Sequence, residues 1–222
     1  MNIKTLIFDW DGTLHDTESL YGASLRQTLK WLADQGYSVS EDQSDERFRR
    51  YLGVNAVDMW NDFMPELPEE MKGACSSRTG ENIVRLIQAG QARMYPSAMD
   101  VLRELKSHGF QMVILSNCKV SYMDAQRAYF GLDEVFDAYY CCGAYDFKPK
   151  EEIFTDVQAK FPGEYLMIGD RASDRRVAEI HGIHFLGCAY GFGEQSEIDG
   201  GDGILNSIAE LPDKLGAMED CF

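Results

Sequence analysis

Short apolar segments alternate with helical patterns along most of this chain, and no other feature limits its fold as strongly. The segments cover residues 3–8, 112–115, 138–141, 165–168 and 183–186. Apolar runs of this length are typical of strands buried on both faces, and helices between them serve as the crossovers that parallel strands need. The pattern therefore predicts an α/β fold with a doubly wound, Rossmann-like parallel sheet.

The helices between these strands can be located from the residues at their ends. Ser97 with Asp100 is typical of a capping box at a helix start, and Gly109 lies where that helix should end. Further helices are predicted over residues 121–129, 151–160 and 172–181. Strands and helices in this order predict right-handed βαβ units.

The first and second predicted strands are much farther apart than a simple crossover requires, which is about a dozen residues. Leucines recur at helical spacing within residues 17–36, and residues 41–64 and 77–93 continue the helical pattern without strand alternation. We therefore predict a small α-helical domain inserted after the first strand. The predicted boundaries are 1–15 and 94–222 for the core domain and 16–93 for the inserted domain.

Composition and charge exclude several classes of partner. The chain has 222 residues, 45% of them hydrophobic, and a formal net charge of −16 at pH 7. Such a surface repels nucleic-acid backbones and anionic membranes. No apolar run approaches the roughly 18 residues that cross a bilayer, and Lys4 and Asp9 interrupt the segment where a signal peptide needs its apolar stretch. We expect a cytoplasmic monomer or small homo-oligomer that binds no nucleic acid and no membrane.

The cysteines are too sparse for a disulfide framework in a chain of this length. They are Cys75, Cys118, Cys141, Cys142, Cys188 and Cys221. None forms the CxxC pattern of a structural zinc site. We expect reduced thiols in packing or surface positions, with Cys118 of interest because it directly follows Ser116 and Asn117.

Two carboxylates follow the first predicted strand, in the string DWDGT at residues 9–13. Asp9 and Asp11 are two residues apart, so in extended chain they point the same way, at the sheet edge where such folds bind ligands. Two like charges held this close imply either a bound metal or acid/base chemistry. The calcium-loop pattern is not met, because Leu14 and Leu20 stand where Gly and Glu are needed.

Polar residues also follow the next three predicted strands. Ser116 and Asn117 end the second one, and a hydroxyl and an amide there are suited to bonding phosphoryl oxygens. Lys148, in the string DFKPK, follows the third strand, and Asp170 and Asp174, in GDRASD, follow the fourth. Taken singly, these are also typical turn residues, surface charges or helix caps. Their shared position at one sheet edge favours a binding site.

In order and spacing, DWDGT, LSN, the lysine of DFKPK and GDRASD resemble the four motifs of the haloacid dehalogenase (HAD) superfamily of phosphohydrolases. The resemblance runs over nearly the whole chain. It implies a Rossmann-like core with a helical first-type cap, similar to the branch that contains phosphoglycolate phosphatase and β-phosphoglucomutase.

The resemblance also implies a role for each motif residue. Asp9 would be the nucleophile that forms an aspartyl phosphate, and Asp11 the acid that protonates the leaving alcohol and then activates water. The residues implied to bind the phosphoryl oxygens are Ser116, Asn117 and Lys148. The implied cofactor is Mg²⁺, and its implied ligands are Asp9, the backbone carbonyl of Asp11, Asp170 and Asp174.

The expected function is Mg²⁺-dependent hydrolysis of a small-molecule phosphate monoester, with phosphoglycolate as the leading substrate. Dehalogenases of the superfamily lack the second carboxylate, so Asp11 argues against them. Thr13 stands where the sugar phosphomutases tend to carry Val, which favours a phosphatase. The alternatives are a phosphomutase and a catalytically silent regulatory or binding protein of the same fold.

Cationic side chains outside the motifs have two interpretations. Arg47, Arg49 and Arg50 form a cluster in the inserted domain that either receives a second anionic group of the substrate or forms a solvated helix face. Arg171, directly after Asp170, either touches the substrate or forms an ion pair, and we favour the ion pair.

Three aromatic residues and one histidine outside the motifs also have two interpretations each. His15 follows the first motif and either lines the cleft or has a structural role. Trp31, Phe48 and Trp60 lie at helical positions, where packing inside the inserted domain is favoured over a platform for a sugar.

Overall fold

The fold is seen in a computed structural model that describes residues 3–219. Within these residues the sheet has six strands, all parallel, in the order β3-β2-β1-β4-β5-β6. Their bounds are Ile3–Phe8 (β1), Gln111–Ser116 (β2), Ala138–Cys141 (β3), Glu164–Gly169 (β4), His184–Cys188 (β5) and Gly203–Leu205 (β6). The predicted doubly wound sheet is confirmed. β6 was not predicted, because a strand this short carries no recognisable pattern.

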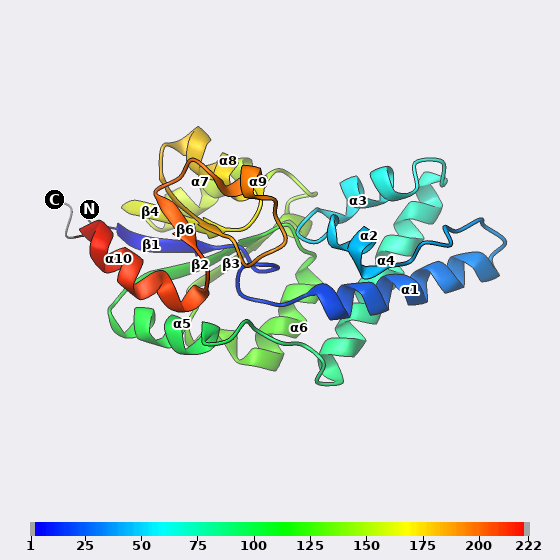
Figure 1. Ribbon diagram of the computed structural model, residues 1–222, viewed down its shortest axis with the longest axis horizontal. Coiled ribbons are helices and arrows are strands. Elements are labelled where there is room, and N and C mark those ends of the chain that lie inside the picture. Colours follow the sequence, from blue (N-terminus) through cyan, green and yellow to red (C-terminus); the bar gives the residue numbers. More distant parts are fainter. Residues whose placement is uncertain (1–2, 220–222) are drawn as a thin grey trace.

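Alternating side chains of the strands supply two separate hydrophobic clusters. Leu6 and Phe8 of β1 belong to one cluster, and Ile7 belongs to the other. This follows from the two-residue period of a strand, which sends successive side chains to opposite faces. The first cluster packs under α5 and α6, and the second under α7 and α8 (Figure 1). A sheet covered on both faces needs strands that are apolar throughout, as the sequence pattern indicated.

The helices that cover the sheet are α5 (Ala98–Ser107), α6 (Val120–Phe130), α7 (Lys150–Lys160), α8 (Ala172–His181), α9 (Gln195–Ile198) and α10 (Leu211–Glu219), with 3-10 turns at Leu132–Glu134, Cys142–Ala144 and Ile208–Glu210. The helices predicted in these regions are confirmed to within a few residues. The predicted capping box at Ser97 is wrong: its φ is 66°, and its side chain makes no capping hydrogen bond. A capping hydroxyl needs a residue in extended conformation, which this left-handed turn does not provide.

The segment between β1 and α5 is helical, as expected, and projects beyond the carboxyl ends of the strands (Figure 1). It contains α1 (Glu18–Asp34), α2 (Asp45–Arg49), α3 (Ala56–Phe63) and α4 (Glu69–Gln88). These helices share their own apolar cluster, which includes Leu29, Phe48 and Trp60. The packing roles expected for Phe48 and Trp60 are thereby confirmed, and Trp31 packs against the same cluster.

The structure shows how the helical pattern of this segment is divided. Residues 41–64 contain two short helices, α2 and α3, separated by a turn in which Gly53 has a φ of 77°. α4 begins directly after Pro68 and not at residue 77, because the polar start of this helix hides its periodicity in the sequence. At its other end α4 places Ile83 and Ile87 in the first core cluster, so the helical segment is anchored to the sheet domain. The domain boundaries at 16 and 93 stay a prediction.

Two further observations concern the described residues as a whole. Between residues 3 and 219, no helix combines the length and the apolar character needed to cross a membrane. The cysteines at positions 75, 118, 141, 142 and 188 are free thiols. Cys221 lies outside the described residues.

Leu6 tests how far stability depends on the central strand. Its side chain is fully buried. Leu6→Ala should lower the free energy of unfolding by about 2–5 kcal/mol, because it removes buried apolar atoms and leaves a cavity. Urea denaturation measures the loss. Val120→Ala, at a valine that is 42% exposed, is the control and should change stability by no more than about 0.5 kcal/mol. Equal losses in both variants would contradict this description of the core.

Candidate active site

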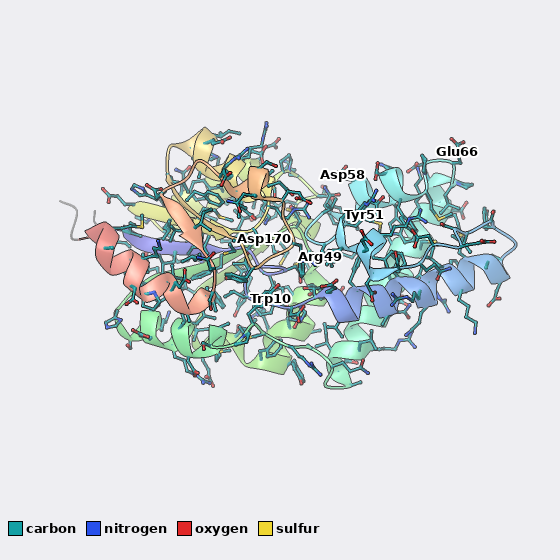
Figure 2. The ribbon with its side chains drawn as sticks, viewed as in Figure 1. Trp10, Arg49, Tyr51, Asp58, Glu66 and Asp170 are labelled. Carbon is teal, nitrogen blue, oxygen red and sulfur yellow. The ribbon has the colours of Figure 1, made fainter. Side chains whose placement is uncertain are left out.

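The site lies where β1, β2 and β4 end, at the sheet edge that faces the inserted helices. Asp9 follows β1, Ser116 ends β2 and Asp170 follows β4. Because β1 lies between β2 and β4, residues that are far apart in the sequence meet at one edge. Figure 2 labels Asp170 at this junction and Arg49 in the inserted segment.

Three carboxylates form a buried cluster at this edge. Asp9, Asp170 and Asp174 each offer an oxygen atom, and these atoms lie within 4.8 Å of one another. All three side chains are almost completely buried. Burial raises the pKa of Asp9 to about 7, a shift that Lys150 opposes and the charge of Asp174 reinforces. Burial, followed by the charges of Asp9 and Asp174, raises the pKa of Asp170 as well. The cluster therefore needs a positive partner to remain ionised.

Lys150 supplies one such partner. Its Nζ atom lies 2.8 Å from Oδ1 of Asp9 and 2.7 Å from Oδ1 of Asp174, and its side chain is fully buried. Burial lowers the pKa of Lys150, but the charges of Asp174 and Asp9 outweigh this effect and the pKa is raised. The amine therefore stays protonated. One ammonium group does not neutralise three carboxylates, so the site keeps a demand for a further cation.

The lysine predicted for this site was Lys148, and that prediction is wrong. Lys148 is exposed and precedes α7, whereas Lys150 is the first residue of the helix, directly after Pro149. Side chains in the first turn of a helix point back toward its N-terminus, and here this direction leads to the sheet edge. Asp146 and Phe147, with φ of 53° and 58°, turn the chain before the helix.

A signal for Lys150 was present in the sequence. Lys150, Ile153, Phe154 and Val157 follow the i, i+3, i+4, i+7 spacing, and all four are buried on the inner face of α7. Lys148 does not fall on these positions. The helical spacing therefore distinguishes Lys150 from Lys148, whereas the DFKPK motif alone does not.

The remaining contacts of the carboxylates fit a divalent cation. Oδ2 of Asp9 is buried and has no hydrogen-bond partner among the described residues. Asp170 is oriented by Thr13 Oγ1, at 3.3 Å from its Oδ1, and by the backbone N–H of Phe192, at 2.8 Å from its Oδ2. Gly12 has a φ of 84°, and a Cβ atom there would collide with the Asp170 carboxylate. Oxygen-only donors of this kind suit Mg²⁺.

Asp11 lies in a different environment from Asp9. Its side chain is 14% exposed and belongs outside the buried carboxylate cluster. Its Oδ1 atom accepts hydrogen bonds from the hydroxyls of Tyr122, at 2.5 Å, and Thr17. Two carboxylates with such different surroundings can take different roles in one reaction.

The side chains at the end of β2 have contrasting positions. Ser116 is buried and lines a cavity next to Asp11. Asn117 lines the same cavity, but both ends of its amide are engaged: Nδ2 donates to the carbonyl of Gly53 at 2.9 Å, and Oδ1 accepts from Sγ of Cys142 at 3.1 Å. Asn117 thus connects the sheet domain to the inserted segment. Its predicted role in phosphoryl binding stays a prediction.

Arg171 forms the second connection of this kind. Its Nε atom lies 3.0 Å from Oε2 of Glu197, which confirms the expected ion pair. The same guanidinium group donates to the carbonyl of Leu52 in the inserted segment. A third link runs from Lys119 Nζ to the carbonyl of Ser76, at 2.9 Å. Together these contacts hold the inserted helices over the site.

The arginine cluster of the inserted segment has other partners. Arg47 donates to Ser40 and to the carbonyl of Asp42, and its guanidinium lies over the Phe63 ring. Arg49 lies over the ring of Phe192, at 6.0 Å from its centroid. Neither arginine lines the cavity at Asp11.

The fold and the site define a HAD-like hydrolase with a Rossmann-like core and an inserted helical segment. The family model for haloacid dehalogenase-like hydrolases matches residues 3–182, and the chain belongs to this family. Its similarities lie with the phosphatases of the family.

Among curated proteins, a phosphoglycolate phosphatase of Vibrio vulnificus is 25% identical over 224 residues, covering 95% of each chain. Protein CbbY of Cereibacter sphaeroides is 24% identical over 227 residues, covering 94% of each chain. A match to a phosphoglycolate phosphatase of Haemophilus influenzae spans 59% of that protein's length, at 23% identity.

Solved structures show the same fold. A predicted phosphatase from Clostridium acetobutylicum superimposes with a TM-score of 0.82 at 22% identity, covering 97% of this chain and 99% of that one. CbbY from Rhodobacter sphaeroides, in complex with phosphate, gives a TM-score of 0.76 at 22% identity, covering 94% and 96% of the two chains.

The two lysines of DFKPK can be compared directly by mutation. Lys150→Ala should lower the free energy of unfolding by about 3–5 kcal/mol in buffer without divalent ions, because it leaves Asp9 and Asp174 buried without their cation. Urea denaturation measures this loss. Lys148→Ala is the matched control, and its stability should equal that of the unmodified protein. A larger loss for Lys148→Ala would contradict the assignment of Lys150 to the site.

Proposed function

We propose that this protein hydrolyses small-molecule phosphate monoesters through an aspartyl phosphate formed on Asp9. The observation that carries the proposal is the buried Oδ2 atom of Asp9, which has no hydrogen-bond partner in the described chain, while Oδ1 is held by Lys150. An ionised carboxylate oriented through one oxygen presents the other to an electrophile. Asp9 needs no separate base, because its ionised form is the nucleophile.

Mg²⁺ is the proposed cofactor. Asp9 and Asp170 would hold it, with the backbone carbonyl of Asp11, while Asp174 is close by in the same buried cluster. When bound, the ion supplies positive charge next to the carboxylates and the phosphoryl group. Lys150 orients Asp9 in this scheme and opposes the rise in its pKa, whereas the role first expected of Lys148 was to bind the phosphoryl oxygens.

Asp11 is the proposed acid and base. It protonates the oxygen of the departing alcohol and then accepts a proton from the water that hydrolyses the aspartyl phosphate. Its position at the cavity and its partial exposure support this role, because the leaving group and water must both reach it. Ser116, in the same cavity, is the proposed hydrogen-bond donor to the phosphoryl oxygens.

The inserted helices are the proposed lid of the site. Asp9 is only 1% exposed, and movement of these helices is the proposed route by which a substrate reaches it. The contacts that must break are those of Asn117 with Gly53, Arg171 with Leu52 and Lys119 with Ser76. Once released from Gly53, the amide of Asn117 is free to contact the phosphoryl group. Closure then excludes water from the reaction.

Phosphoglycolate is the first substrate to assay, because several relatives carry the name phosphoglycolate phosphatase. A sugar phosphomutase remains the alternative among enzymes, and a silent binding protein the alternative outside them. The cytoplasmic location and the state of monomer or small homo-oligomer remain predictions.

The test is the release of inorganic phosphate from p-nitrophenyl phosphate. We expect activity that is lost on chelation with EDTA and restored by Mg²⁺. Asp9→Asn should lower kcat by about 10⁴-fold or more, because the nucleophile is removed. Isomerisation of a sugar phosphate with little phosphate release would favour the phosphomutase. Equal rates for Asp9→Asn and the unmodified protein would overturn the mechanism.

A further inference from the structure

We propose that the cavity beside Asp11 selects phosphate esters whose alcohol portion is uncharged and mainly apolar. The inference rests on the proposed function, because Asp11 marks where the departing alcohol lies. The cavity has a volume of about 110 Å³ and lies between the sheet domain and the inserted helices. Polar residues of the core, Asp11, Ser116 and Asn117, form one side of it.

The inserted segment lines the cavity mainly with apolar side chains. These are Leu52, Val54, Met59, Trp60 and Ile83, and the hydroxyl-bearing Tyr51, Ser76 and Thr79 lie among them. A phosphate ester bound with its phosphoryl group near Asp9 therefore directs its alcohol portion toward hydrocarbon. Burial of that portion is favourable only if it is itself apolar, since an uncompensated charge there loses its hydration.

Cationic groups that could compensate a second negative charge are scarce around this cavity. Among the described residues that line it, none is an arginine, and the arginines at 47, 49 and 50 lie elsewhere. Lys119 does line it, but its Nζ donates to the carbonyl of Ser76. Burial also lowers the pKa of Lys119. A carboxylate or second phosphate on the alcohol portion would therefore be poorly compensated.

The cavity also has a limited size. The volume is somewhat smaller than the roughly 150 Å³ of an apolar cavity that binds benzene. A short branched chain or a small ring fits this description.

The experiment compares kcat/KM for butyl phosphate, benzyl phosphate and phosphoglycolate. We expect the better of the two neutral esters to exceed phosphoglycolate by at least about tenfold, the range that apolar contacts give in a pocket. Met59→Ala should raise KM for the neutral esters severalfold and change KM for phosphoglycolate less. Thermal unfolding of this variant separates lost binding from lost folding.

The variant Lys119→Met tests whether the cavity instead recognises an anionic alcohol portion. Under the proposal this variant keeps the preference for neutral esters. A higher kcat/KM for phosphoglycolate in the unmodified protein, lost by tenfold or more in Lys119→Met, would overturn the proposal and assign anion recognition to Lys119. Absence of phosphate release from every ester would instead overturn the proposed function itself.

A separate hydrogen-bond cluster points to His15 and Tyr122 as positioning residues for Asp11. Tyr122 donates to Oδ1 of Asp11, and Nδ1 of His15 lies 3.3 Å from the same oxygen. Nδ1 of His15 also lies 3.1 Å from the Tyr122 hydroxyl and 2.7 Å from Oγ1 of Thr17. All hydrogen bonds to the Asp11 side chain from the described residues therefore fall on Oδ1.

His15, a member of this cluster, is itself held in place by neighbouring side chains. His15 is fully buried, and its ring stacks on Trp10 with centroids 5.6 Å apart and an interplanar angle of 9°. The amide of Gln126 lies 3.3 Å from Nε2 of His15. Fixing Oδ1 of Asp11 in this way leaves Oδ2 as the atom that exchanges a proton with the leaving group. The rotation of the carboxylate is then set by Tyr122 and His15.

Leaving-group dependence tests this positioning role. Proton donation matters most for a poor leaving group such as an alkoxide, and least for nitrophenolate. Tyr122→Phe should therefore lower kcat for butyl phosphate by about tenfold or more and kcat for p-nitrophenyl phosphate much less, with KM nearly unchanged. His15→Phe, which keeps the stacking on Trp10, should act in the same direction.

Tyr129→Phe is the matched control, since Tyr129 lies on the same helix and is 43% exposed. It should change neither rate. Equal losses for both substrates in Tyr122→Phe would show a merely structural role and overturn the positioning role. Failure of the unmodified protein on both substrates would count against the proposed function instead.

Discussion

The buried ammonium group of Lys150, placed between Asp9 and Asp174, is the interaction on which the site depends. Burial and the neighbouring carboxylates raise the pKa of Asp9 and of Asp170, and at Asp9 the charge of Lys150 opposes this rise. A buried ion pair of this kind contributes little net stability, because desolvation offsets the attraction. Its value is in orientation: it holds one oxygen of Asp9 and leaves the other without a partner.

Asp9 and Asp11 lie in different surroundings, although only one residue separates them in the sequence. Asp9 faces the buried cluster and Lys150, whereas Asp11 faces the cavity and the hydroxyls of Tyr122 and Thr17. The two carboxylates are close in sequence but meet different dielectric surroundings and different hydrogen-bond donors. The proposed nucleophile and the proposed acid thus come from one short loop, with their roles separated by the elements packed around it.

Much of the fold could be predicted from the sequence, and the misses have clear physical causes. Strands β1 and β3 match their predicted bounds, since buried parallel strands are continuous apolar runs with sharp ends. The start of α4 was missed because polar residues such as Lys72 and Thr79 occupy some of its buried positions and hide the apolar periodicity. The capping box at Ser97 was wrong because local backbone geometry, which the residue types did not reveal, is left-handed there.

The sequence by itself determined the class of fold and the edge at which the carboxylates gather, because apolar periodicity and strand ends are local properties of the chain. Only the tertiary structure decided which lysine enters the site, since this depends on the direction in which the first turn of α7 projects its side chains. It also decided that Asn117 contacts Gly53 and that Asp11 contacts Tyr122. Those pairs are separated by long stretches of chain, and packing between helices and sheet, rather than any local pattern, brings them together.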